Sequence, residues 1–229
     1  MSIALSLRVL ARLLGYPDAE MRAHLPALRE ALRGERALGD ARLAELDALA
    51  DALAGADPLD AEAAYVQLFD RGRATSLHLF EHVHGDSRER GPAMIDLAQT
   101  YDQAGLYLAP GELPDYLPAV LEFASTLPPR EARAFLGEMA HIFNALFSAL
   151  RERQSAYASV LGALLELAGE KAQPVKVEPE EPLDAAWSEP PAFDGCSQQG
   201  QSKGGQSRPG QPQPIRIVRQ DPAAKGAPA

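Results

Sequence analysis

Cysteine is almost absent from this 229-residue chain, which has a single thiol, Cys196. One cysteine cannot build an intramolecular disulfide framework or a cysteine-based zinc site, and it fits a reducing compartment. Long apolar runs are also missing, since no stretch approaches the ~20 residues of a membrane span. The opening segment, MSIALSLRVLARLLGY, lacks a leading basic region and carries Arg8 and Arg12 inside its apolar pattern. It therefore predicts a first helix rather than a signal peptide, and we expect a cytoplasmic protein.

Lysine is absent from residues 1–170, which hold 15 arginines against 25 aspartates and glutamates. The net charge of −10 belongs to this part of the chain, because residues 171–229 carry seven residues of each sign. An acidic surface disfavours nucleic acid, whose phosphates require a basic partner. It suits a cationic partner such as a basic peptide; the alternative is that the charge serves solubility alone.

Strand-like alternation is not evident in residues 1–170, where apolar residues recur at helical spacing. One such stripe runs from Phe135 to Leu150 and predicts a single helix; a second stripe follows it. Because one helix through both stripes would be unusually long, we predict a break near residues 151–155. The expected fold class is all-α, a single globular helical domain of about nine helices over residues 1–170.

The composition changes over residues 171–229, which contain ten prolines and six glycines together with a Gln/Ser/Gly run. Such a segment cannot bury enough apolar surface to fold, so we predict a disordered C-terminal tail. Two less polar islands, residues 182–193 and 214–219, interrupt it. Each either docks as an extended segment on the body or a partner, or is an incidental part of an unattached tail.

A cluster of histidines lies in the middle of the chain. We expect a helix over residues 75–85, which would place His78 and His82 on one face, four residues apart. With Glu81 as general base, His-x-x-Glu-His is the inverzincin zinc signature. A third ligand would have to come from Asp70, His84, Asp86 or Glu112. Because a five-residue pattern is weakly specific, we favour the alternative that both histidines form hydrogen bonds within a polar layer between helices.

Four arginines flank these histidines: Arg71, Arg73, Arg88 and Arg90. Arginine forks bind carboxylates through two hydrogen bonds. We therefore favour internal pairing with nearby acidic residues over binding of an external anion such as a phosphate. The candidate acidic partners are Asp70, Glu81, Asp86 and Glu89.

A third motif, GELPDY, ends at Tyr116. Pro114 favours an extended approach, and Asp115 is suited to cap the next helix. The functional alternative is an exposed acidic and aromatic patch for a peptide. Nucleophile elbows, phosphate-binding glycine loops and dinucleotide fingerprints are not found, so an enzyme would depend on His78, Glu81 and His82 alone.

Four stretches carry a family resemblance. Tyr65-Val-Gln-Leu-Phe resembles the Y-x-x-L-F motif of the redox-enzyme maturation chaperones, the all-helical family that serves molybdoenzymes, and Glu-Leu-Pro-Asp-Tyr at residues 112–116 resembles its E-x-P-D-H/Y motif. Residues 69–91 are closely similar to the signature of the NarJ-type delta-subunit branch, the assembly chaperones of respiratory nitrate reductase. PLDAAWSEPP in the tail also resembles that branch. Tyr116 stands where many members carry histidine.

The resemblance implies a chaperone rather than an enzyme, with no catalytic residue, no metal and no cofactor of its own. Its partner would be the apo catalytic (alpha) subunit of nitrate reductase, bound through the N-terminal peptide and kept competent for molybdenum cofactor insertion before membrane assembly. The implied peptide-binding residues are Tyr65, Leu68, Phe69, Glu112, Asp115 and Tyr116. The remaining signature residues are Asp70, Arg71, Arg73, His78, Glu81, His82, His84 and Arg88.

Two alternatives remain open at this point. Within the family, the client would be another molybdoenzyme, such as a sulfoxide or amine-oxide reductase. Outside it, the chain would be a helical zinc hydrolase that uses His78, Glu81 and His82.

Overall fold

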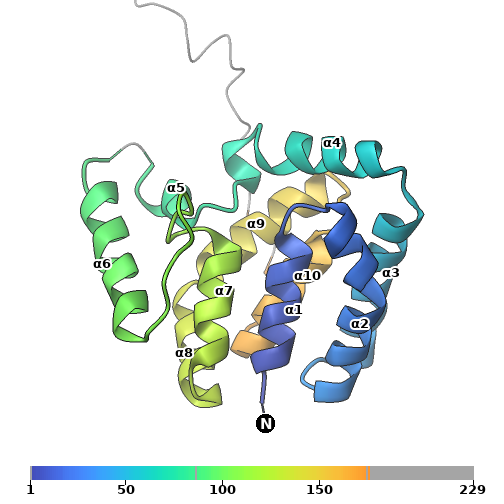
Figure 1. Cartoon of the computed structure of the whole chain (residues 1–229), viewed down its shortest axis with the longest axis horizontal. Helices are drawn as coiled ribbons and strands as arrows, with labels where there is room; N and C mark the ends of the chain where they lie inside the picture. The colour runs from blue at the N-terminus through green and yellow to red at the C-terminus, as the bar shows by residue number, and fades with distance from the viewer. Residues whose placement is uncertain (1, 86, 174, 176–229) are drawn as a thin grey trace, which may run out of the picture. The chain divides into compact units, whose positions relative to one another are not determined.

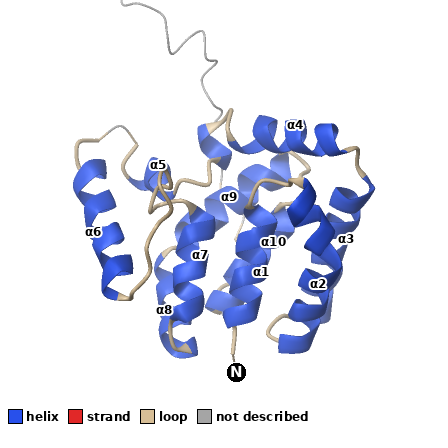
Figure 2. Cartoon of the chain, viewed as in Figure 1, coloured by secondary structure: helices blue, strands red, loops and turns tan. Residues whose placement is uncertain are grey.

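The computed structural model describes residues 2–85, 87–173 and 175, and its secondary structure is helical (Figures 1 and 2). Within these ranges there are ten α-helices, one 3-10 helix and no strand, so the all-α class is confirmed and the expected count of about nine is one too few. The elements are α1 (Ala4–Leu14), α2 (Ala19–Glu35), α3 (Asp40–Gly55), α4 (Pro58–Phe69), η1 (Arg73–Thr75), α5 (Leu79–Val83), α6 (Arg90–Gln103), α7 (Leu117–Thr126), α8 (Pro129–Glu138), α9 (Ala140–Glu152) and α10 (Ala158–Ala168).

The core is built around α1 and α10. Helix α1 packs against α2, α7 and α10 (Figure 1), and its leucines Leu7, Leu10 and Leu14 are fully buried. Helix α10 is buried on most of its surface because it contacts α1, α3, α8 and α9. Each buried leucine contributes about 1.5–3 kcal/mol relative to an exposed one, so this stack supplies much of the drive for folding.

Local sequence signals set several helix ends. Asp18 precedes α2 and accepts a hydrogen bond from the Met21 N–H at 2.7 Å, the expected N-cap contact. Pro58 is the first residue of α4, where its missing N–H costs nothing. The predicted break near residues 151–155 is confirmed between α9 and α10, and Gln154 there has a left-handed φ of 54°.

The stripe from Phe135 to Leu150 does not form the single helix that was expected. It is divided at Met139 into α8 and α9. The two helices have different neighbours: α8 packs against α7 and α10, whereas α9 packs against α10 and η1. Because tertiary packing sets the directions of α8 and α9, the spacing of apolar residues continues unchanged across the break and gives no sign of it.

The expected histidine helix over residues 75–85 is also wrong. Helix α5 contains five residues, and His78 precedes it in an extended conformation, with φ −87° and ψ 105°. Its backbone forms an isolated antiparallel bridge with Tyr116. The Leu79 N–H donates to the Asp115 carbonyl at 3.0 Å, and the Leu117 N–H donates to the Leu77 carbonyl at 2.8 Å. Pairing with a segment almost forty residues away therefore prevents a longer helix.

Helix α6 is loosely attached to the core. Tyr101 is its one buried residue, and Ile95 is 59% exposed. In Figure 1 it stands at one edge of the bundle, beyond α5 and α7. The chain returns from α6 through residues 104–116 to α7, and this return contains the GELPDY motif.

The chain leaves α10 along α9. The Gln173 N–H donates to the Asn144 side chain at 2.7 Å, and the Val175 N–H donates to the Ser148 hydroxyl at 3.0 Å. The rest of the predicted tail, including both islands and Cys196, lies outside the described residues. Across the described ranges, no helix has the length and apolar character required to cross a membrane.

Candidate functional site

The two short motifs meet through a pair of tyrosines. Tyr65 on α4 and Tyr116 at the start of α7 have their hydroxyl oxygens 3.3 Å apart. The Tyr65 hydroxyl donates to the Leu14 carbonyl at 2.7 Å, which leaves its oxygen to accept from Tyr116. Burial raises the pKa of Tyr65 far above its ordinary value, so the phenol keeps the proton that it donates.

The YxxLF motif belongs to an aromatic cluster in the core. The Tyr65 ring lies 4.8 Å from Phe69 and 6.1 Å from Tyr157, and Phe69 lies 5.0 Å from Tyr157. Tyr65 and Phe69 are only 5% and 4% exposed, and Leu68 is half-buried. Tyr65 and Phe69, which the resemblance places at a peptide-binding surface, therefore point into the core and support the residues that pack against them.

Asp115 is a buried hub rather than a surface charge or a helix cap. Its side chain is 0% exposed, and Tyr116, not Asp115, occupies the position before α7. The carboxylate accepts from the His78 Nδ1–H and from the Phe80 N–H, both at 3.2 Å. A guanidinium nitrogen of Arg90 lies 3.8 Å away. The expected exposed acidic patch is therefore wrong for Asp115, which joins the GELPDY loop to the segment at α5.

The charged groups around this hub reinforce it. The hydrogen bond to Asp115 is the main cause that raises the pKa of His78, and the charge of Glu81 acts in the same direction. Arg90 also pairs with Glu81 at 3.5 Å, which confirms internal pairing for this arginine. The other charged signature residues, Asp70, Arg71, Arg73 and Arg88, are exposed.

The histidines do not form the metal-binding face that the zinc alternative requires. His78 lies outside α5, and His82 uses Nε2 to bond the Ser76 carbonyl at 2.8 Å. His84 ends α5 with its ring 5.3 Å from that of Phe80. Throughout residues 2–85, 87–173 and 175, no group of three or more His, Cys, Asp or Glu side chains is arranged to hold a metal ion. Hydrogen bonding within the fold accounts for both His78 and His82.

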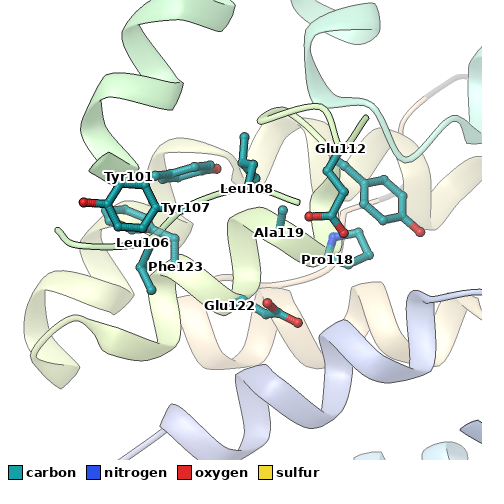
Figure 3. Close-up of a pocket in the computed structure, with 10 residues that line it drawn as sticks. Tyr101, Leu106, Tyr107, Leu108, Glu112, Pro118, Ala119, Glu122 and Phe123 are labelled. Atoms are coloured by element: carbon teal, nitrogen blue, oxygen red, sulfur yellow. The ribbon is translucent and has the colours of Figure 1, made fainter. Parts of the chain in front are cut away.

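A groove lies beside this hub, between α7 and the return from α6 (Figure 3). It has a cavity volume of about 130 Å³. Aromatic side chains gather at one end and Glu112 lies at the other, with Glu122 on the α7 side. The lining residues are Tyr101, Leu106, Tyr107, Leu108, Glu112, Tyr116, Pro118, Ala119, Glu122 and Phe123.

The sequence motifs identified only Glu112 and Tyr116 among these lining residues. Ala119 and Phe123 are four apart on α7 and so share a face. The run Leu106-Tyr107-Leu108 was the other available signal, because three apolar residues in a row are unusual in a short loop between Gly105 and Pro110. What the sequence could not show is that the loop folds back over α7.

Comparison with known proteins explains why these motifs occur together. Residues 14–162 match the model of the nitrate reductase delta subunit family. The chain belongs to this family. It is 42% identical over 199 residues to the nitrate reductase molybdenum cofactor assembly chaperone NarJ of Escherichia coli K12, an alignment that covers 87% of this chain and 84% of the relative. The expected relationship to the NarJ-type branch is confirmed.

Two further proteins are similar to this chain. A probable NarJ of Bacillus subtilis is 34% identical over 157 residues, which are 68% of this chain and 84% of that protein. The crystal structure of a candidate redox enzyme maturation protein from Archaeoglobus fulgidus superposes with a TM-score of 0.55 over 74% of this chain and 96% of that one. At 20% identity, this last likeness establishes a shared fold alone.

Proposed function

We propose that this delta subunit family member is a cytoplasmic, non-enzymatic chaperone for nitrate reductase. It binds the N-terminal segment of the apo catalytic subunit and supports insertion of the molybdenum cofactor before the enzyme assembles at the membrane. The observation that carries the proposal is the 42% identity to E. coli NarJ over an alignment that covers 87% of this chain.

The groove is the proposed binding site for the client segment. Its aromatic end receives the apolar face of an amphipathic peptide, as in other helix-in-groove complexes. Glu112 and Glu122 attract the basic residues of the same peptide, and the acidic charge of the body speeds their encounter. Tyr116 contributes to the wall directly.

The buried motif residues act from behind the groove. Tyr65 holds Tyr116 through the hydroxyl pair, within a support formed by Phe69 and Leu68. Asp115 fixes the end of the loop that carries Glu112. The residues of the two motifs therefore have different parts in one site: Glu112 and Tyr116 contact the peptide, and the motif residues packed behind them hold this pair in position.

Calorimetry with a synthetic peptide tests the site. The probe is the first segment, about 15 residues or four helical turns, of the catalytic subunit encoded by the same organism. Changing Glu112 and Glu122 to glutamine together removes two charges from partly exposed positions, each worth up to about 1 kcal/mol, so Kd should rise about 5- to 30-fold. Glu30→Gln, an exposed change on α2, is the matched control.

Two results would count against the proposal. Absence of binding to the nitrate reductase peptide, with binding to the corresponding peptide of a sulfoxide or amine-oxide reductase, would reassign the client. Equal Kd values for the wild type and the double variant would remove the groove from the site.

A further inference from the structure

The return from α6 passes over the groove as a short segment between two glycines. Gly105 and Gly111 have φ values of +76° and +92°, in the left-handed region that other residues seldom adopt. Between them, Leu106 and Leu108 line the groove, while Tyr107 is 81% exposed. We call residues 106–110 the flap.

The two bases of the flap are held firmly. At one base, the Tyr101 hydroxyl donates to the Pro114 carbonyl at 2.8 Å, and its ring lies 5.0 Å from that of Phe123. At the other base, Asp115 is locked into the hub described above. Motion in this region is therefore confined to the exposed and half-buried residues between these two points, because Tyr101 on one side and Pro114 and Asp115 on the other are buried.

A side chain just beyond the flap holds it in the conformation seen here. The Glu112 carboxylate accepts a hydrogen bond from the Ala109 N–H at 3.1 Å, and the Glu112 N–H donates to the Ala109 carbonyl at 3.0 Å. The same carboxylate lies at the edge of the groove (Figure 3). Glu112 is exposed, so a cation that enters the groove can reach it.

We propose that residues 106–110 form a movable flap over the groove and that Glu112 is its latch. A basic residue of an incoming peptide competes with the Ala109 N–H for the Glu112 carboxylate, because a charged donor makes the stronger hydrogen bond. The flap is thereby released at its Glu112 end, turns about Gly111 and closes its leucines over the apolar face of the peptide. At its other end the Leu106 N–H donates to the Tyr101 carbonyl at 2.9 Å, so Gly105 caps α6 and keeps that end in place. This regulation rests on the proposed function, since it makes peptide charge the trigger for enclosure.

Residue-resolved amide exchange, followed by NMR in the full chain, tests the latch without any peptide. In the wild type, the amides of the flap should exchange at least about tenfold faster than those of α7, which is buried and helical. Glu112→Ala should accelerate the Ala109 amide about tenfold, the equivalent of one hydrogen bond to a charged group. Glu112→Gln keeps an acceptor oxygen and should leave this rate within about twofold of the wild type.

Addition of the catalytic-subunit peptide tests closure. Saturating peptide should slow exchange of the Leu106 and Leu108 amides about tenfold in the wild type, whereas the Ala109 amide loses its acceptor and should not slow. Gly111→Ala, which strains the hinge, should weaken peptide binding about fivefold, since alanine at this φ costs about 1 kcal/mol. The control for that strain is Gly169→Ala at the end of α10, which should leave Kd unchanged. Gly169 has a φ of +84° and equally open space for a Cβ.

The outcomes separate the two proposals. Flap amides as protected as those of α7, or an Ala109 amide indifferent to Glu112→Ala, would overturn the latch. Tight peptide binding without slower flap exchange would overturn closure while leaving the binding site in place. A peptide that fails to bind would overturn the proposed function, and the exchange rate of Ala109 in the free protein would still decide the latch.

Discussion

Replacement of Asp115 should damage stability far more than it damages peptide recognition. The side chain is 0% exposed and serves three groups: the Phe80 N–H, the His78 ring and the Arg90 guanidinium. Asp115→Asn retains one acceptor oxygen but places an NH₂ group against the remaining donors. Asp115→Ala leaves all three without their acceptor in a buried site.

The magnitude follows from these contacts. Loss of one charge-assisted hydrogen bond costs about 2 kcal/mol for Asp115→Asn, and loss of the whole carboxylate costs about 3 kcal/mol for Asp115→Ala, because His78 and Arg90 are partly exposed and Arg90 keeps Glu81. For a body of this size, 1 kcal/mol corresponds to about 2–4 °C in Tm, so the asparagine variant should melt about 4–8 °C lower. Urea unfolding followed by circular dichroism measures the free energy directly.

Two comparisons make the test decisive. Asp70→Asn, an exposed change in the same signature, should alter the free energy of unfolding by less than about 0.5 kcal/mol. Peptide binding by Asp115→Asn, measured well below its Tm, should be weakened less than binding by the Glu112/Glu122 double variant. Unchanged stability of Asp115→Asn together with a large loss of affinity would refute the reasoning, because it would require Asp115 to meet the peptide itself.

Three further predictions concern packing and pH. Gly162→Ala should stabilise the protein less in the wild type than in an Arg42→Ala background, because a Cβ at residue 162 would displace the guanidinium of Arg42. In the Arg42→Ala background helix propensity should give about 1 kcal/mol, and equal effects in the two backgrounds would contradict this explanation. Tyr157→Phe should leave the free energy of unfolding unchanged or slightly higher, since the buried hydroxyl has no hydrogen-bond partner among the described residues. Tyr65→Phe, in contrast, should lower the free energy of unfolding by about 1–2 kcal/mol, because it loses two hydrogen bonds. Equal urea midpoints for the two variants would refute this contrast. The hydrogen bond to Asp115 raises the folded-state pKa of His78, so its contribution to stability is fully present below the unfolded pKa of about 6.5 and is lost as pH rises through the folded value. The stability difference between wild type and His78→Gln should thus be larger at pH 5.5 than at pH 8.5, and a difference independent of pH would show that folding does not raise the pKa of the ring.

Helical periodicity predicted most of the fold because it is a local property. The stripe in α1, the cap at Asp18 and the break between α9 and α10 all depend on residues within a few positions of one another. The break at Met139 could not be predicted in this way, because the apolar residues continue in phase through it. Only the different neighbours of α8 and α9 require the chain to turn there.

The site was harder to predict because its residues are distant in sequence. The family motifs include Glu112 and Tyr116, which line the groove, but the pattern gave no indication that Asp115 is fully buried. It also gave His78 a helical position that the bridge to Tyr116 prevents. Burial and long-range pairing depend on what the rest of the chain places nearby, and no local pattern contains that information.

The sequence by itself determined the helical class, the acidic charge of residues 1–170 and the membership of a chaperone family, because composition, periodicity and motif identity are properties of the chain. The tertiary structure alone decided which residues of those motifs are exposed at the groove and which are buried behind it. Tyr65 and Asp115 are adjacent in space to Tyr116 and Glu112, yet the first pair is buried and the second lines the groove. The difference arises from packing: an aromatic cluster and a carboxylate shielded from water hold the loop, and the side chains left at its surface are the ones that can bind.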